Sequence, residues 1–209
     1  IFLSHANFDH FSAIGDLVRQ VPVGQVCVGP TFRQDAGHNH AASLLQAEIE
    51  LAGVPMNTLA RPAKLAVEPE ASVEILWPTP TPSGHDNDAS LVLKLNIRGR
   101  TILFCGDIQA KAEEALLAHP GDLSASILIA PHHGSAEQTS AAFVKAAAPK
   151  MILACSAMRL SGKQVAFDQI VGSTPLVRTG RNGAITLRVQ PDGGMSVETW
   201  RTGLHWEWP

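Results

Sequence analysis

The hydrophobic and polar positions of the chain alternate between short apolar runs and longer amphipathic stretches. Runs rich in valine, isoleucine and leucine predict strands at 25–29, 126–130 and 151–155. Apolar residues spaced three or four positions apart predict helices at 12–21, 40–51, 109–118 and 139–147. This alternation of strands and helices is typical of an α/β protein.

Two segments carry the signal of a β-hairpin. Residues 90–97 and 100–105 flank Arg98-Gly99, and residues 184–189 and 195–200 flank a turn at 191–194. The proline-rich stretch 61–82 is predicted to be irregular, apart from a strand at 72–76. The hairpins add antiparallel strands to a mixed sheet, and the first of them places Asp107 just after a strand.

Length and composition indicate one folded unit. With 209 residues, the chain is long enough for a single domain over 1–209 with a sizeable core. No apolar run approaches the roughly 20 residues that cross a bilayer. The net charge of −3 means that binding of a polyanion must depend on a local basic face or on a metal. The three cysteines are far apart in apolar runs and are predicted to be buried free thiols.

Potential metal ligands gather near the start of the chain. The apolar run 1–3 predicts a strand. The loop that follows this strand carries the side chains of His5, Asn7, Asp9 and His10. Within a tight turn, such side chains can converge on one point or on two adjacent points. Imidazole and carboxylate together suit zinc, manganese or iron. The alternative is a hydrogen-bonded loop beside a core.

Two later segments also place polar side chains at strand ends. Asp107 follows the strand 100–105, and His132 and His133 follow the apolar run 127–131. Taken alone, Asp107 would be the N-cap of the helix that follows it. Adjacent histidines do not readily serve one metal symmetrically, so we expect one of the pair to bind metal and the other to face the substrate.

These segments resemble the motifs of the metallo-β-lactamase superfamily, whose first motif is His-x-His-x-Asp-His. With 87–93 upstream and 179–185 downstream of the His-His-Gly-Ser loop, the chain is similar to the lactamase-like domain of ComEC/Rec2 competence proteins. The resemblance implies an αββα sandwich. Those relatives open with a hairpin before the first histidine motif, and nothing here corresponds to it, so we expect the fold to lack its first strands and the chain to be a fragment of a larger protein.

The resemblance also implies a set of metal ligands. Asp9, His10 and His132 match one metal position, Asp107 matches the bridge between positions, and His5 matches the other position. At that other position Asn7 replaces a histidine, and Asn87 stands where many members place a third histidine. Because asparagine is a weaker ligand than imidazole for zinc-like ions, we expect divalent zinc or manganese in one tight site and one weak site.

The catalytic residues expected from the resemblance are Asp9, His133 and Lys163. Within this set His133 faces the substrate, and Lys163 occupies the place of a histidine that the family often carries in a Gly-His-Pro motif. A basic rim is expected from Arg159, Lys163, Arg178 and Arg181.

The functional prediction is a metal-dependent hydrolase, a nuclease or phosphodiesterase that acts on single-stranded DNA during DNA uptake. The alternative is a degenerate lactamase-fold module that binds DNA or a protein partner without catalysis. By resemblance, the chain would be an extracytoplasmic domain of a bacterial membrane-embedded protein.

Overall fold

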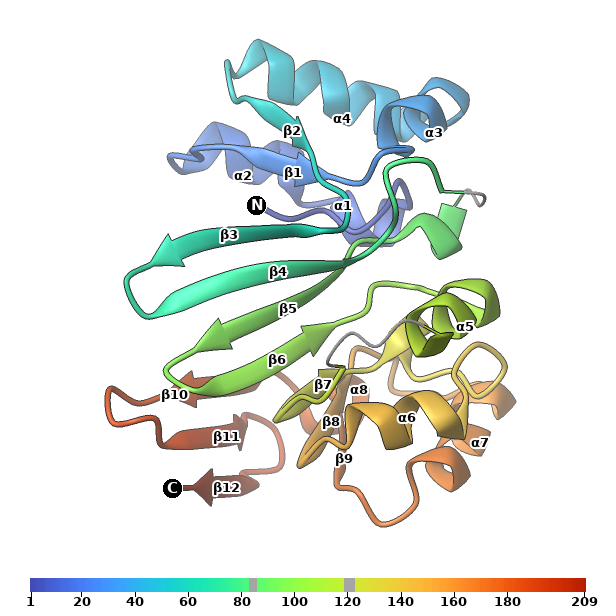
Figure 1. The fold of residues 1–209 in the computed structure, drawn as a ribbon, viewed down its shortest axis with the longest axis vertical. Coiled ribbons are helices and arrows are strands. Elements are labelled where there is room, and N and C mark those ends of the chain that lie inside the picture. The colour runs from blue at the N-terminus through green and yellow to red at the C-terminus, as the bar shows by residue number, and fades with distance from the viewer. Residues whose placement is uncertain (83–85, 119–122) are drawn as a thin grey trace.

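A mixed seven-stranded sheet forms the centre of the molecule (Figure 1). The computed structural model describes residues 1–82, 86–118 and 123–209. The sheet follows chain order: β3 (Ala63–Glu68), β4 (Ala71–Trp77), β5 (Val92–Ile97), β6 (Arg100–Phe104), β7 (Ile127–Ile129), β8 (Met151–Ala154) and β9 (Leu176–Arg178). Pairing is antiparallel from β3 to β6 and parallel from β6 to β9, so the carboxyl ends of β6 to β9 share one edge.

Helices cover one face of this sheet, and a second sheet packs on part of the other. The covering helices are α5 (Ala110–Ala118), α6 (Ala141–Ala147) and α7 (Gly162–Val171), and their core includes the fully buried Phe143 and Phe167. On the other face, β10 (Ile185–Val189), β11 (Met195–Thr199) and β12 (His205–Trp208) form an antiparallel sheet. Met195 and Val197 pack there against residues of β7 to β9. The central sheet is therefore flanked on both sides, as the αββα prediction requires.

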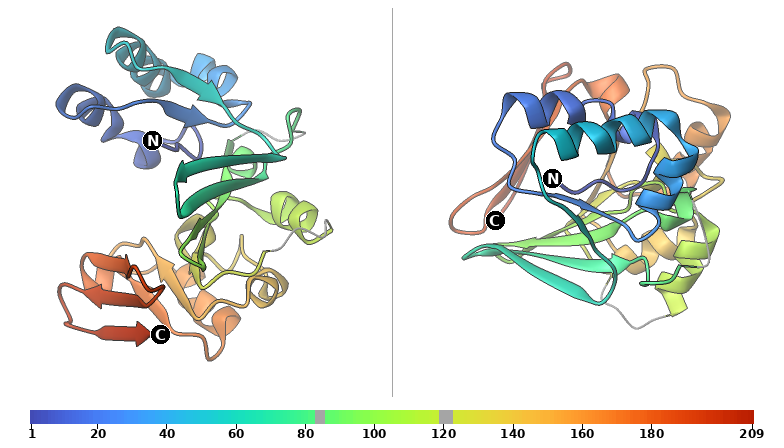
Figure 2. Two further views of the ribbon diagram at one scale, coloured as in Figure 1. Left: turned by 60° about the vertical axis from the view of Figure 1, so that its left-hand side comes forward. Right: turned by 90° about the horizontal axis from the view of Figure 1, so that it is seen from above.

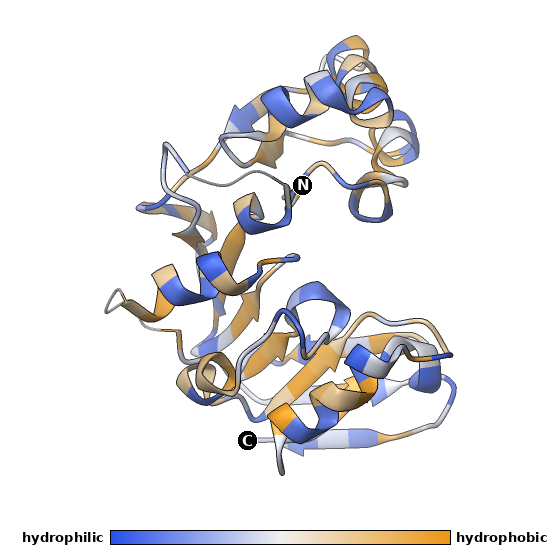
Figure 3. Cartoon of the chain, turned by 90° about the vertical axis from the view of Figure 1, so that its right-hand side faces the viewer, coloured by the Kyte–Doolittle hydropathy of each residue, from blue (hydrophilic) through white to orange (hydrophobic). Residues whose placement is uncertain are grey.

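The N-terminal elements form a smaller layer with a core of its own. It contains the parallel pair β1 (Val26–Val28) and β2 (Met56–Thr58), with α1 (Phe8–Phe11), α2 (Ile14–Gln20), α3 (Phe32–His38) and α4 (His40–Leu51). Its core includes Leu3, Phe11 and Ile49. Figure 2 shows this layer beyond β3, and Figure 3 shows apolar residues concentrated on the strands. In the residues that the structure describes, no helix has the length and apolar character of a membrane span.

Most predicted elements are confirmed. The first hairpin turns at Arg98 and Gly99, both with positive φ, and Ser140 caps α6 by accepting from the Phe143 N–H. The elements that were not predicted are α1, α3, α7, α8 (Thr179–Asn182), β2, β3, β9 and β12. The remaining predicted helices and strands appear with bounds shifted by a few residues.

Three predictions about local structure were wrong. Within 61–82 the predicted strand 72–76 is confirmed as β4, but 63–68 is not irregular: it forms β3 and pairs with β4. All five prolines of this stretch, at 62, 69, 78, 80 and 82, lie outside both strands and remove no pairing N–H. The run 1–3 is not a strand: it makes a single bridge, from Phe2 to Cys27. Asp9 and His10 lie in the short helix α1 and not in a loop.

Candidate metal centre

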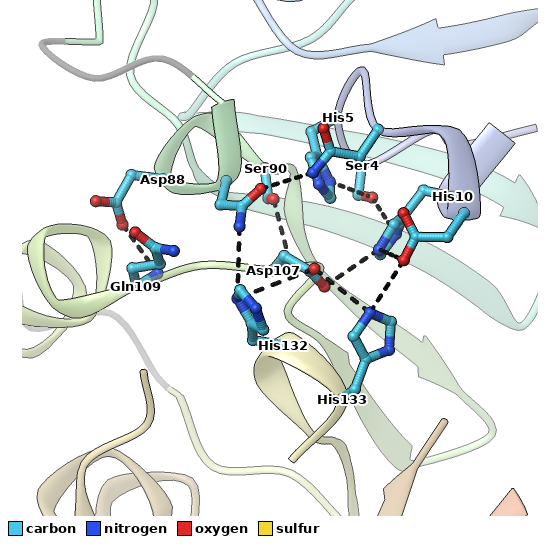
Figure 4. Close-up of polar contacts among 12 residues, drawn as sticks. Ser4, His5, His10, Asp88, Ser90, Asp107, Gln109, His132 and His133 are labelled. Atoms are coloured by element: carbon cyan, nitrogen blue, oxygen red, sulfur yellow. Dashed lines mark hydrogen bonds and ion pairs between the residues drawn. The ribbon is translucent and has the colours of Figure 1, made fainter. Parts of the chain in front are cut away.

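The predicted ligands come together from three parts of the chain (Figure 4). Asp107 follows β6, and His132 and His133 lie in the short 3₁₀ segment η2 (Pro131–His133) after β7. Parallel pairing brings these two strand ends to the same edge. The segment that carries His5 and His10 is fixed beside them, because the Leu91 N–H, just before β5, donates to the carbonyl of Ser4.

Asp107 lies at the middle of the cluster and is 4% exposed. One of its oxygens is 3.3 Å from His10 Nε2, and the other is 3.5 Å from His133 Nε2. His133 Nε2 also lies 3.3 Å from the Asp9 carboxylate. Two groups therefore bring possible ligand atoms within 4.8 Å of one another: His5, His10 and Asp107, and Asp9, His10 and His133.

The carboxylate of Asp107 is not used as a helix cap. Asp88 caps α5 in its place, since its Oδ1 accepts from the N–H groups of Gln109 at 2.9 Å and Ala112 at 3.2 Å. The backbone N–H of Asp107 donates to Ser90 Oγ. The side chain of Asp107 is therefore free to face the histidines.

Burial and neighbouring charge set the protonation of the cluster. Burial, followed by the nearby His10, lowers the pKa of His5 to about 4. Burial would lower the pKa of His10, but the hydrogen bond and charge of Asp107 outweigh it and raise that pKa. Burial would raise the pKa of Asp107, and the adjacent histidines outweigh it and lower that pKa. At neutral pH the centre holds a neutral His5 and an ionised Asp107, the forms that bind metals.

The residues present fit a divalent metal ion. The His5 Nε2 atom is buried and has no hydrogen-bond partner within the described part of the chain. Ser4 Oγ lies 3.1 Å from Nδ1 of both His5 and His10. When the hydroxyl oxygen of Ser4 accepts from both Nδ1–H groups, the Nε2 lone pairs of both histidines are available to a metal. A buried imidazole nitrogen without a partner, beside a carboxylate, is a donor set that suits zinc or manganese.

The two adjacent histidines sit in a left-handed backbone. His132, His133 and Gly134 have φ of 46°, 58° and 75°, a conformation that costs a non-glycine residue about 1–2 kcal/mol. The Gly106 carbonyl accepts from the His132 N–H at 3.1 Å, and Gln164 Nε2 donates to the His133 carbonyl at 3.3 Å. These bonds hold a turn that would otherwise be unfavourable, and such turns cluster at functional sites.

A carbonyl from the next strand fixes the ring of His133. His133 Nδ1 is 3.0 Å from the carbonyl oxygen of Cys155. Since a carbonyl only accepts, Nδ1 carries the proton, and Nε2 presents its lone pair to Asp9 and Asp107.

Gly106 allows the backbone to approach this closely. Its φ is +56°, and a Cβ placed on it would be 2.8 Å from the Cβ of Ser90 and 3.0 Å from the Cβ of Ser4. Any larger residue would be strained and would push Asp107 away from its partners.

Asn7, Asn87 and His132 form a second set beside the cluster. Asn7 Nδ2 donates to Asn87 Oδ1 at 2.9 Å, and Asn87 Nδ2 lies 3.5 Å from His132 Nδ1. His132 Nδ1 is 4.0 Å from Asp107, and His132 joins neither of the two ligand groups. The roles predicted for both residues stay predictions.

The predicted basic rim is only partly present. Arg178 is not an exposed rim residue: it is buried, and its Nη1 lies 2.7 Å from Asp168. Lys163 lies in the first turn of α7 and pairs with Glu137, and its catalytic role stays a prediction. Arg159 and Arg181 are exposed.

Sequence reasoning missed the groups that orient the ligands: Ser4, Ser90, Gln164 and the Cys155 carbonyl. Ser4 stands next to His5 in sequence, which was an available signal, but the other three reach the centre only through the fold. The cysteine prediction is confirmed for Cys27 and Cys105, which are buried, and wrong for Cys155, which is exposed.

The centre opens into a cavity of about 590 Å³. His10, Asp107 and His133 line one end of it, and apolar side chains of the central sheet, among them Leu93 and Phe104, line the rest. The cavity gives a ligand access to the cluster while its walls remain largely apolar.

Comparison with known proteins agrees with this architecture. The metallo-beta-lactamase superfamily profile matches residues 1–151. The chain is 29% identical over 161 residues to "Competence protein ComA" of Neisseria gonorrhoeae, covering 75% of this chain and 20% of that protein. It is 25% identical over 192 residues to "ComE operon protein 3" of Bacillus subtilis (strain 168), covering 90% of this chain and 24% of that protein. The chain thus spans about a quarter or less of the length of these relatives.

A solved structure is similar over nearly the whole chain. The metallo-beta-lactamase fold protein YhfI from Bacillus subtilis superposes with a TM-score of 0.51 at 15% identity, over 99% of this chain and 76% of that one. At this identity the similarity supports the fold alone.

Proposed function

Because the chain belongs to the metallo-beta-lactamase superfamily, we propose that it is a metal-dependent phosphodiesterase that acts on DNA. The observation that carries the proposal is the convergence of three histidines and two aspartates at one edge of the central sheet: His5, Asp9, His10, Asp107 and His133. Among them, the buried Nε2 of His5 has no hydrogen-bond partner within the described residues.

The metal would be held chiefly by Asp9, His10, Asp107 and His133. His133 is preferred over His132 because its Nε2 faces both carboxylates, whereas His132 Nδ1 is 4.0 Å from Asp107. This assignment reverses the roles that the resemblance implied for the two histidines. When bound there, a divalent cation supplies Lewis acidity to a phosphoryl oxygen and a water of lowered pKa.

His132 is proposed to handle a proton at its Nε2 atom. Asn7 donates to Asn87, and Asn87 Nδ2 faces His132 Nδ1. If Nδ1 accepts that hydrogen bond, Nε2 carries the proton and can donate it to the leaving oxygen of a phosphodiester. General-acid assistance of this kind typically contributes about 10²–10⁴-fold to rate.

DNA is proposed as the substrate because both curated relatives are named as competence or ComE-operon proteins. We propose further that the substrate is single-stranded, that the chain serves DNA uptake, and that it belongs to a larger extracytoplasmic, membrane-embedded protein. No membrane span lies in the described residues, so that larger protein would supply the membrane part.

The test uses the purified chain loaded with manganese or zinc and a simple phosphodiester, bis(p-nitrophenyl) phosphate. We expect slow hydrolysis that is lost in His10→Ala, since His10 belongs to both ligand groups. His205→Ala, at an exposed histidine on β12, is the matched control and should keep wild-type activity.

A second candidate is a module that binds DNA without cleaving it. It is favoured by the Asn7–Asn87 hydrogen bond, which satisfies two amides at the position where the family places histidines. A metal-loaded chain with no hydrolysis above the His10→Ala background, but with salt-sensitive DNA binding, would establish this candidate and remove the first.

A further inference from the structure

A second cavity, of about 840 Å³, lies beside β9, the short helix α8 (Thr179–Asn182) and the turn after β11. Its charged lining consists of Arg178, Arg181, Arg201 and Asp168. Apolar side chains complete the walls: Met158, Leu160, Leu176, Leu204 and Trp206. We refer to it as the arginine cavity.

Arg178 is a fixed part of the wall of this cavity. Its side chain is 10% exposed, Nη1 pairs with Asp168, and Nη2 donates to the Gln164 carbonyl at 2.8 Å. Its Nε is buried and has no hydrogen-bond partner in 1–82, 86–118 or 123–209. The contacts of Nη1 and Nη2 therefore hold Arg178 in place as part of the cavity wall, and the donors free for a ligand must come from the other arginines.

The cavity also has unneutralised positive charge. Arg178 and Asp168 offset each other, and Asp168 is the one carboxylate among the described lining residues. Arg181 is exposed and forms no ion pair with a described residue, and Arg201 is held only through Nη1, which donates to the Gly180 carbonyl at 2.7 Å. Two guanidinium groups therefore remain to bind an anion, and their planar donors match phosphate oxygens.

A continuous edge of loops joins this cavity to the metal centre. His133 contacts the Cys155 carbonyl after β8, and the Ser156 N–H donates to Thr179 Oγ1 after β9 at 3.0 Å. Gly180 lies so close to this loop that a Cβ on it would be 2.2 Å from the Ala157 carbonyl oxygen. Strands β7 and β9 are two positions apart in the sheet, about 10 Å, a span that an extended strand of a few nucleotides can bridge.

We propose that the arginine cavity binds a phosphate of single-stranded DNA, with its base against the apolar wall, while another phosphate of the same strand lies at the metal centre. The contact between the second phosphate and the metal centre rests on the proposed function. Arg181 and Arg201 supply donors, and Trp206 and Leu204 supply a surface on which a base can stack or pack.

The test measures binding of a short fluorescein-labelled oligothymidine by fluorescence anisotropy over a series of salt concentrations. Arg181→Gln and Arg201→Gln should each weaken binding roughly tenfold at low salt and reduce the slope of log affinity against log salt by about 0.7 per lost phosphate contact. Hydrolysis of bis(p-nitrophenyl) phosphate, which is too small to reach the cavity, should be unchanged. Arg188→Gln on β10 is the matched control, an exposed arginine paired with Glu198.

The outcomes separate the two proposals. Wild-type affinity and salt slope in both arginine variants would overturn the arginine cavity even if the small phosphodiester is hydrolysed. If the two arginine variants lose oligothymidine binding while the wild type binds but does not hydrolyse the small phosphodiester, the arginine cavity is supported and the phosphodiesterase proposal is overturned. Arg181 is exposed and unpaired among the described residues, so Arg181→Gln is expected to fold, and its thermal midpoint provides the check.

Discussion

At the scale of single residues, the position of Ser4 explains how two imidazoles can serve as ligands. Its hydroxyl oxygen is 3.1 Å from Nδ1 of His5 and of His10. When it accepts from both N–H groups, it fixes both tautomers and both ring planes. Ser4 thereby prepares the Nε2 atoms without contacting a metal itself.

Ser4→Ala should therefore lower metal affinity by about 10–100-fold, since groups that orient metal-binding histidines have effects of this size. The fold should be retained, because Ser4 contributes little apolar burial. Titration with manganese or zinc followed by calorimetry measures the affinity. Ser12→Ala, an exposed serine just after α1, is the control. Equal affinity in Ser4→Ala and wild type would show that the hydroxyl does not orient the histidines.

The residue types of the centre were readable from sequence, but their individual roles were not. His5, Asp9, His10 and Asp107 stand out because polar ligands follow apolar runs at short spacing. The choice between His132 and His133 depends on a left-handed turn and on a carbonyl from a neighbouring strand. No local pattern reports such torsion angles or cross-strand contacts.

At the scale of elements, predictions held where the signal was local. The Arg98-Gly99 turn of the first hairpin is such a signal, and it is confirmed. The hairpin of β3 and β4 was missed because its prolines suggested irregular structure, although each lies outside a strand. β4 pairs with β3 on one side and with β5 on the other, and local sequence propensity cannot predict such long-range pairing.

The packing of α5 against α6 contains a buried carboxyl with a testable pH response. Glu113 is 3% exposed, its Oε2 accepts from the Ser140 N–H at 2.9 Å, and burial raises its pKa. A raised folded-state pKa gives stability that is present below the unfolded pKa and is lost as pH rises through the folded value.

The unfolding free energy of Glu113→Gln should therefore increase relative to that of the wild type as the pH rises. The increase should occur between the ordinary pKa of glutamate and a pH above the raised pKa of Glu113. The neutral amide oxygen keeps the bond to Ser140 and avoids burying a charge. Urea denaturation at acidic and mildly alkaline pH gives the difference in unfolding free energy between the two proteins. The neighbouring exposed Glu114→Gln should show no such trend. A difference that stays constant or falls with pH would mean that Glu113 is not held neutral by burial.

At the scale of the whole molecule, the carboxyl edge of the central sheet collects the chemistry. Asp107, the His132–His133 turn, the Cys155 loop and α8 follow β6, β7, β8 and β9 in order. The N-terminal layer adds its histidines to the same edge through the bond between Leu91 and Ser4. The net charge of −3 is compatible with the proposed DNA binding because Arg178, Arg181 and Arg201 line one cavity and can give it a local positive charge.

The same arrangement limits how many metals the centre can hold tightly. The two ligand groups share His10, and a single Nε2 lone pair binds one ion, because Nδ1 of that ring is directed to Ser4. If His10 joins Asp9 and His133, the other position keeps His5 and a share of Asp107, while Asn7 is engaged with Asn87. An asparagine oxygen is a weak substitute for imidazole at a zinc-like ion.

We therefore expect about one tightly bound divalent metal per chain after dialysis, and a rise toward two in Asn7→His, which replaces the amide by a stronger ligand. Elemental analysis of dialysed protein measures both values. Asn57→His, which adds a histidine on the exposed strand β2, controls for adventitious binding and should stay near the wild-type value. Two stoichiometric metals in the wild type would contradict the limit set by the shared His10. An unchanged metal content in Asn7→His, with one metal in the wild type, would mean that residue 7 faces Asn87 and not the metal.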